Sequence, residues 1–146
     1  GAKKPSSSTA AQKPLFQYFE VTVVNLVKGA TVMVGLAAKD FPATSSMPGW
    51  KSGSLGYNSC DGALFCGSSL RPYKFQNRTV QAFGEGDVIG CGYNAQSQQV
   101  FWTKNGHYLG AAERGHSKLA YLYGFSLFPT VGFTSTCTLK ANFGTD

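Results

Sequence analysis

The sequence predicts an all-β fold, a two-sheet antiparallel β-sandwich, on three observations. Between residues 84 and 111, apolar runs are followed by a hairpin turned at Asn105-Gly106, a dipeptide in which both residues accept positive φ. Eighteen glycines, six prolines and 14% aromatic residues suit short strands joined by tight turns. Strand patterns never alternate with long helical ones, which excludes a parallel α/β sheet. About nine short strands in ~130 residues are typical of a sandwich.

The first ordered strand is expected to begin at residue 15. Residues 1–14 have no apolar periodicity, so we expect a flexible lead-in followed by one domain over residues 15–146. Strands are predicted at residues 15–24 and 31–37, with a turn at Lys28-Gly29 between them. The second of these strands is almost continuously apolar, so it should be buried on both faces.

The middle and end of the chain continue the pattern of strands and turns. A long loop over residues 39–53 carries Pro48-Gly49-Trp50, and Asp61-Gly62 is expected to turn between the next two strands. The remaining strands are predicted, in order, at residues 54–57, 63–66, 87–94, 99–104, 107–111, 126–133 and 138–143. Two more long loops, over residues 67–82 and 112–124, separate some of them.

The positive charge does not predict a nucleic-acid partner. The formal net charge is +6, but Lys3, Lys4 and Lys13 lie in the opening segment. Without those three the balance is about +3, too weak to indicate a phosphate-tracking surface. No apolar run reaches the ~18 residues that a membrane span requires, so no membrane insertion is expected.

The four cysteines predict neither disulfides nor a metal site. Cys60, Cys66, Cys91 and Cys137 form no Cys-x-x-Cys pair, and no secretory signal is present. We expect reduced thiols in an intracellular, cytoplasmic protein without a metal or cofactor. The glycines from Gly84 to Gly90 depart from the dinucleotide fingerprint and precede a strand instead of a helix.

The titratable side chains do not predict catalysis. The chain has seven carboxylates and two histidines in all. Glu85 and Asp87 have the spacing of one strand face, but turn formation at a glycine-rich strand entry explains both of them. We therefore expect a protein that is not an enzyme.

Several motifs in their order along the chain resemble those of a SPRY domain. They are Tyr18-Phe19-Glu20-Val21, Val34-Gly35-Leu36, Pro48-Gly49-Trp50, Gly56-Tyr57, Asp61-Gly62, Gly86-Asp87-Val88-Ile89-Gly90-Cys91-Gly92, Phe101-Trp102-Thr103-Lys104-Asn105-Gly106, Leu109-Gly110, Leu127-Phe128-Pro129-Thr130-Val131-Gly132 and Asn142-Phe143-Gly144. The resemblance runs from about Leu15 to Gly144. Within the family, the chain resembles the branch that includes Ran-binding protein M and fungal ubiquitin-ligase adaptors.

This resemblance implies a bent β-sandwich of concanavalin-like jelly-roll architecture, without enzymatic activity, that binds proteins through loops at one end. In members that bind short peptides, the contact positions correspond here to Phe65, to residues 66–70 with Cys66, Ser69 and Leu70, and to Thr134, Ser135 and Thr136. Two features depart from the family pattern. The lead-in lacks the arginine that such members often use, and the stretch over residues 111–126 is longer than usual.

Aromatic and basic residues supply further candidates for a partner surface. Trp50 and Tyr57 are aromatic candidates, although Trp50 is expected to plug the sandwich edge. Phe65 is equally well explained as a partner anchor or as a structural residue. Arg71 and Tyr73 belong to a loop that also holds Lys74, Phe75 and Arg78, which is either solvated or selects acidic peptides or RNA.

The resulting functional hypothesis is a non-catalytic protein–protein interaction module. It would bind a short peptide or loop of a partner and would be a monomeric domain of a larger protein, such as a ubiquitin ligase or a trafficking complex. The alternative hypothesis is a carbohydrate-binding, lectin-like domain that stacks sugars on aromatic platforms. A structural spacer without a pocket is the third possibility.

Overall fold

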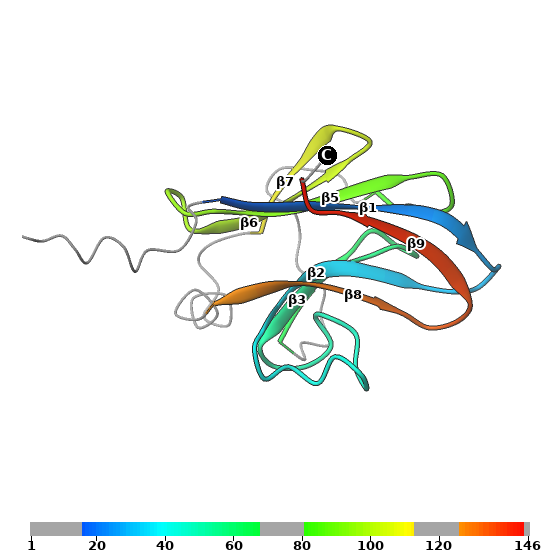
Figure 1. The fold of residues 1–146 in the computed structure, drawn as a ribbon, viewed down its shortest axis with the longest axis horizontal. Coiled ribbons are helices and arrows are strands. Elements are labelled where there is room, and N and C mark those ends of the chain that lie inside the picture. The colour runs from blue at the N-terminus through cyan, green and yellow to red at the C-terminus, as the bar shows by residue number, and fades with distance from the viewer. Residues whose placement is uncertain (1–15, 68–80, 113–125, 145–146) are drawn as a thin grey trace, which may run out of the picture.

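The computed structural model describes residues 16–67, 81–112 and 126–144, and it confirms the all-β prediction. Every regular element in these ranges is a strand, and the strands form two stacked antiparallel sheets (Figure 1). The strands are β1 (Phe16–Leu26), β2 (Val32–Ala38), β3 (Ser54–Asn58), β4 (Leu64–Cys66), β5 (Val88–Asn94), β6 (Gln99–Lys104), β7 (His107–Ala111), β8 (Leu127–Phe133) and β9 (Cys137–Asn142).

The two sheets have five and four strands among the described residues. The five-stranded sheet has the order β7-β6-β5-β1-β9, and the four-stranded sheet has the order β4-β3-β2-β8. The turn at residues 28–29 forms where it was predicted, but it carries the chain from one sheet to the other instead of closing a hairpin. The link from β8 to β9 crosses between the sheets in the same way, and each of these two strands lies at an edge of its sheet.

The hairpin between β6 and β7 has the predicted Asn-Gly geometry. Asn105 and Gly106 have φ values of 52° and 83°, the positive values that this turn requires. The Asn105 amide donates to Asp87 Oδ1 at 2.9 Å and accepts the Val88 N–H at 2.8 Å. Partial burial raises the pKa of Asp87, but hydrogen bonds from Asn105 and Gly84 and the Lys104 charge outweigh it and lower the pKa. Asp87 thus fastens a turn, as the sequence indicated.

The core lies between the two sheets and is built from alternate residues of the strands. β2 is buried along almost its whole length, as predicted, and Trp102 of β6 is fully buried. The Trp102 indole N–H donates to the Val34 carbonyl of β2 at 2.9 Å, so this side chain ties one sheet to the other. The core residues are Phe19, Val21, Val23, Val32, Val34, Leu36, Leu55, Tyr57, Leu64, Cys66, Phe83, Ile89, Cys91, Val100, Trp102, Leu109, Ala112 and Leu127.

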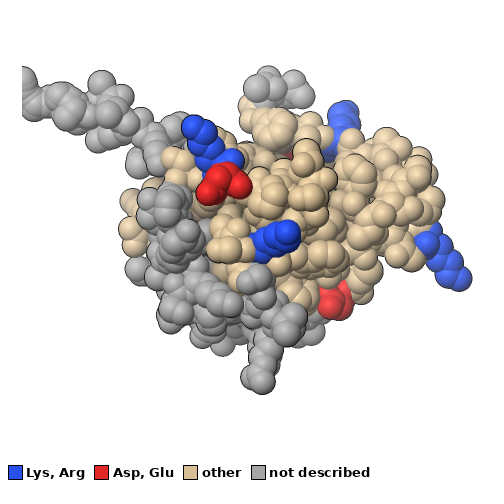
Figure 2. All heavy atoms as spheres, turned by 90° about the horizontal axis from the view of Figure 1, so that it is seen from below, with Lys and Arg blue, Asp and Glu red and all other residues tan. Residues whose placement is uncertain are grey.

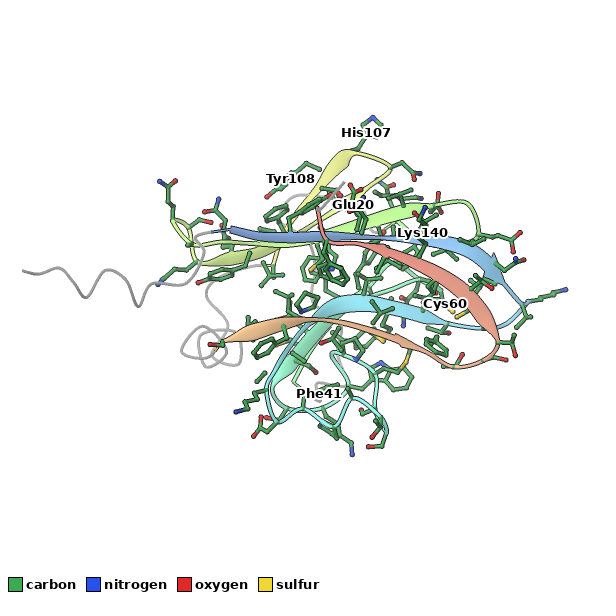
Figure 3. All side chains as sticks on the ribbon, in the orientation of Figure 1. Glu20, Phe41, Cys60, His107, Tyr108 and Lys140 are labelled. Atoms are coloured by element: carbon green, nitrogen blue, oxygen red, sulfur yellow. The ribbon has the colours of Figure 1, made fainter. Side chains whose placement is uncertain are left out.

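The outer face of the five-stranded sheet carries a row of aromatic rings. Phe101 lies on the opposite face from Trp102, because successive side chains of a strand alternate, and its ring centroid is 6.0 Å from that of Tyr18 and 5.8 Å from that of Tyr108. A Cβ at Gly90 would overlap the Tyr18 hydroxyl, so the absent side chain lets Tyr18 lie across the sheet. Figure 3 shows Tyr108 on this outer side. These rings pack on one another.

The charge and the thiols of the described residues agree with the sequence interpretation. The described ranges hold five lysines and five carboxylates, so the +6 of the whole chain resides in the remaining segments. All four cysteines are free thiols. Among the described residues, no helix has the length and apolar character that crossing a membrane would need.

Candidate functional site

The loop over residues 39–53 folds back over the outer face of the four-stranded sheet. Met33 faces away from the core, yet it is fully buried because the loop covers it. Glycines on neighbouring strands make room for the loop: a Cβ at Gly56 would overlap the Pro48 carbonyl, and one at Gly132 would lie 2.6 Å from the Met47 sulfur. Figure 1 shows the loop below β2, β3 and β8, and Figure 3 places Phe41 within it.

Gly49 sets the path of this loop where it turns back toward β3. Its φ is +98°, which disfavours any residue with a side chain, and a Cβ there would lie only 2.7 Å from the Phe65 carbonyl oxygen. The Gly49 N–H donates to the Ser54 hydroxyl at 2.7 Å, and that hydroxyl donates to the Lys51 carbonyl at 2.8 Å. The Trp50 N–H donates to the Met47 carbonyl at 3.1 Å. Buried Ser54 therefore fixes the segment from which Trp50 projects.

The prediction that Trp50 plugs the sandwich edge is wrong, because its side chain is 45% exposed. Met47 and Pro48, both buried, cover the sheet in its place. The chain reverses at Gly49 immediately after them, and this reversal turns the next side chain outward. A large exposed indole on a loop that is fixed by hydrogen bonds is suited to contact a partner.

Trp50 forms one wall of a groove of about 770 Å³ between the loop and the end of β8. The groove is lined by Ala43, Thr44, Ser45, Ser46, Met47, Trp50 and Lys51 from the loop and by Val131, Gly132, Phe133 and Thr134 from β8 and its end. Phe133 is 55% exposed, so the groove carries a second exposed aromatic side chain. The two come from segments far apart in the sequence.

Among the described residues, the loop side of the molecule carries few charges. Figure 2 views the protein from this side, and the described surface is mostly uncharged, with only a few basic and acidic side chains. Lys51 is the one charged residue among those that line the groove in the described structure. The groove is therefore matched to an apolar or neutral partner more than to a strongly charged one.

Among the described residues, the members of the two predicted contact groups lie apart. Thr134 lines the groove, and the exposed Ser135 and Thr136 follow it in the link to β9. Cys66 of β4 pairs with Leu55 of β3, which pairs with Leu36 of β2, which pairs with Pro129 of β8. Cys66 therefore lies level with Pro129 along the strand direction. Thr134 lies five residues beyond Pro129, about 16 Å along the strand direction at ~3.3 Å per residue. Phe65 is level with Thr130, near the middle of β8, and β3 and β2 lie between β4 and β8, so neither Phe65 nor Cys66 adjoins Thr134.

Two of the predicted contact residues are buried, and these predictions are corrected. Tyr57 is 0% exposed because it faces the core, where its hydroxyl donates to the Gln81 carbonyl and its ring packs on Phe83 at 4.8 Å. Burial raises the pKa of Tyr57, and the Asp87 charge raises it further. Cys66 is 2% exposed and belongs to the same core. Neither side chain is accessible to a partner.

The remaining candidates divide into one described residue and a group outside the structure. Phe65 is partly buried and lies against Gly49, where it supports the loop. Ser69, Leu70, Arg71 and Tyr73, and with them the basic loop, lie outside the described residues. The partner role predicted for this group stays a prediction.

Sequence reasoning missed most of the groove. Residues 43–47 and the outer edge of β8 have no motif that indicates binding, because the groove arises only when the loop folds over the sheet. The available signal was Pro48-Gly49-Trp50, in which a Pro-Gly turn precedes a large aromatic residue. That signal gave the position of the turn but not the direction of the indole.

The chemistry of the groove is that of a binding surface. It offers hydroxyl groups, two aromatic rings and one lysine, and none of the carboxylates or histidines that the structure describes lines it. Among the described residues, no three His, Cys, Asp or Glu side chains come close enough to hold a metal ion. The arrangement can bury apolar side chains and hydrogen-bond a polypeptide backbone.

Replacing Gly49 with alanine is expected to lower the free energy of unfolding by about 1–3 kcal/mol, since the new Cβ meets Phe65 and the positive φ disfavours it. Urea unfolding measures this loss. Gly29→Ala is a matched control, because Gly29 has a φ of +86° with nothing within 4 Å of its would-be Cβ. Equal losses in the two variants would contradict the close approach of Gly49 to Phe65.

Comparisons with known proteins identify similar sequences and structures. The family profile described as SPRY domain matches residues 16–146. The chain is 35% identical to Ran-binding protein 10 of Danio rerio over 97% of this chain and 22% of that protein. It is 35% identical to Ran-binding protein 9 of Homo sapiens over 97% of this chain and 18% of that protein. A crystal structure of a human SPRY domain matches with a TM-score of 0.66 and 27% identity, covering 89% of this chain and 78% of that one.

Proposed function

Because the chain belongs to the SPRY domain family, we propose that it binds a short segment or loop of another protein in the groove between residues 43–51 and the end of β8. SPRY domains are in general protein-interaction modules. Which surface binds, and what it binds, is proposed from the exposed side chains of Trp50 and Phe133, which both line one groove.

The exposed pair carries this proposal because aromatic side chains on a rigid surface are the usual anchors of an interface. The bonds of Ser54 hold the loop backbone around Trp50, and Phe133 ends a strand, so little backbone freedom is lost when a partner covers them. The area of one short segment is small. We therefore expect an affinity on the order of micromolar.

The setting of the domain follows from the lengths of its relatives. The chain spans about a fifth of the length of the Ran-binding proteins that it matches. We infer that it acts as the partner-recognition part of a larger intracellular protein, an adaptor in a ubiquitin-ligase or trafficking complex. The lectin-like alternative would need aromatic rings open to a sugar; Tyr57 is buried and offers none, so that alternative depends on Trp50, which is 45% exposed.

The test is a peptide selection followed by a block of the groove. Twelve-residue peptides are selected from a random display library on the whole chain, and the affinity of the tightest one is measured by fluorescence polarisation. Thr44→Arg places a long charged side chain in the groove lining, and we expect it to weaken binding at least tenfold.

A control variant adds the same charge elsewhere. Gln96 is exposed in the turn between β5 and β6, outside the groove lining, so Gln96→Arg should bind the peptide as the wild type does. Unchanged binding by Thr44→Arg would contradict the proposed site. So would a selection that yields no binding peptide.

A further inference from the structure

β8 is an edge strand, and its free side runs along the groove. It pairs with β2 on one side, and within the described structure no strand pairs with its other side. Val131, Gly132, Phe133 and Thr134, which end this strand and follow it, all line the groove. An open strand edge presents unpaired N–H and C=O groups that another strand can satisfy.

The register shows which backbone groups point to the free side. Residues opposite each other in an antiparallel pair alternate between exchanging hydrogen bonds and not exchanging them. The Thr134 N–H donates to the Thr31 carbonyl at 3.0 Å, so Thr134 and, two residues back, Gly132 bond toward β2. Val131 and Phe133 therefore direct their N–H and C=O groups away from β2, toward the groove.

The hydrogen bonds of β2 agree with this alternation along β8. Val32 is paired with Phe133, but the Val32 N–H donates to the Ser59 hydroxyl and its carbonyl accepts the Ser59 N–H, both at 2.9 Å on the β3 side. Val32 thus directs its backbone groups away from β8. Its opposite residue Phe133 is correspondingly left with its own groups on the free side.

Pro129 restricts the open edge of β8 to the C-terminal end of the strand. Pro129 has the same phase as Val131 and Phe133, and it offers no N–H to an incoming strand. A proline at this phase blunts an edge in the manner that natural sheets use against aggregation. The stretch from Val131 to Phe133 remains open, and this is the stretch that the groove exposes.

We propose that the partner segment binds as an added β-strand on β8, pairing its backbone with Val131 and Phe133. This inference rests on the proposed function and specifies the conformation and chemistry of the ligand. Two outward-pointing residues can exchange about four hydrogen bonds with an added strand. These bonds orient the segment, and its side chains provide selectivity.

The chemistry of the segment follows from what lies on each side of the edge. Side chains of an added strand alternate between the two faces of the sheet. On the outer face they meet the loop, with Trp50 and Met47, and on the inner face they meet the exposed Phe133. Because Lys51 is the one charged residue among the described groove lining, the segment is an extended, uncharged stretch with bulky apolar side chains at alternate positions.

The first arm of the test removes hydrogen bonds from the ligand. The tightest-binding peptide from the random library is synthesised with a single N-methyl group at each backbone amide in turn. Methylation at every second position in the bound stretch should weaken binding at least tenfold, because those amides donate to β8. Methylation at the positions between should change the affinity less than threefold.

The second arm removes a hydrogen bond from the protein. Phe133→Pro and Phe133→Ala both lose the aromatic ring, but only the proline variant also loses the N–H on the free edge. Pro129 shows that β8 accepts proline at this phase. We expect Phe133→Pro to bind the peptide at least fivefold more weakly than Phe133→Ala. Thermal melting checks that both are folded; if the proline variant is not, the methylation series decides alone.

The outcomes separate this inference from the proposed function. Suppose that Thr44→Arg loses binding, but the methylation series shows no alternation or the two folded Phe133 variants bind equally well. The groove would then remain the site, and strand addition would be overturned. Binding untouched by Thr44→Arg would overturn both. Sedimentation would also overturn the proposal if the wild-type chain is a dimer and Phe133→Pro is a monomer. The occupant of the β8 edge would then be a second copy of this chain and not a partner segment.

Discussion

Replacing Trp102 with alanine lowers the free energy of unfolding by about 3–5 kcal/mol, the largest loss that we expect for a single substitution in this chain. The indole is fully buried between the sheets, and its N–H donates to the Val34 carbonyl of the opposite sheet. Alanine removes the ring, leaves a cavity and deletes that bond. Urea unfolding followed by circular dichroism measures the change.

Trp102→Phe separates the two contributions. It keeps an aromatic ring in the core but cannot donate to Val34. We expect the free energy of unfolding to fall by about 1–2 kcal/mol, from the loss of one hydrogen bond and a little packing. A loss below about 1 kcal/mol for the alanine variant would contradict the position of Trp102 at the centre of the sandwich.

The second large effect is expected on binding, not on stability. Replacing Trp50 with alanine should lower the affinity for the selected peptide about 30-fold or more, which corresponds to about 2 kcal/mol of binding free energy for a central aromatic anchor. The free energy of unfolding should change by less than about 0.5 kcal/mol, because the side chain is 45% exposed and Met47 and Pro48 cover the sheet. Fluorescence polarisation and urea unfolding on the same preparations give both values.

Tyr108→Ala is the matched control for this loss. Tyr108 is 53% exposed, close to Trp50 in exposure, but it lies on the outer face of the five-stranded sheet. It should bind the peptide like the wild type. If Trp50→Ala binds normally, or if Tyr108→Ala loses binding to the same degree, the anchor role of Trp50 is contradicted.

Local patterns in the sequence predicted the strands well. The Asn105-Gly106 turn, the Asp61-Gly62 turn and the apolar run of β2 are local features, and each lies where it was expected. Sheet membership is not local. The turn at residues 28–29 was predicted correctly as a turn, but whether it joins paired strands or carries the chain between sheets depends on β5 and β9, which flank β1 from distant parts of the chain.

The candidate site was predicted less well, for a similar reason. Strand phase alone could not show that Tyr57 faces the core, because both faces of β3 are buried. Phe65 and Thr134 were grouped from the family resemblance, and only the register of four strands shows that β3 and β2 separate them and that Phe65 is level with the middle of β8. The groove needs the loop over residues 39–53 to lie on the sheet, which depends on Gly56 and Gly132 in different strands.

The most direct test of the binding groove is an NMR titration of the isotope-labelled chain with the selected peptide. We predict that the largest shift changes fall on the Trp50 indole and on the amides from Val131 to Thr134, while the amides around Tyr18, Phe101 and Tyr108 stay in place. Changes confined to the outer face of the five-stranded sheet, with the Trp50 indole unmoved, would contradict the account.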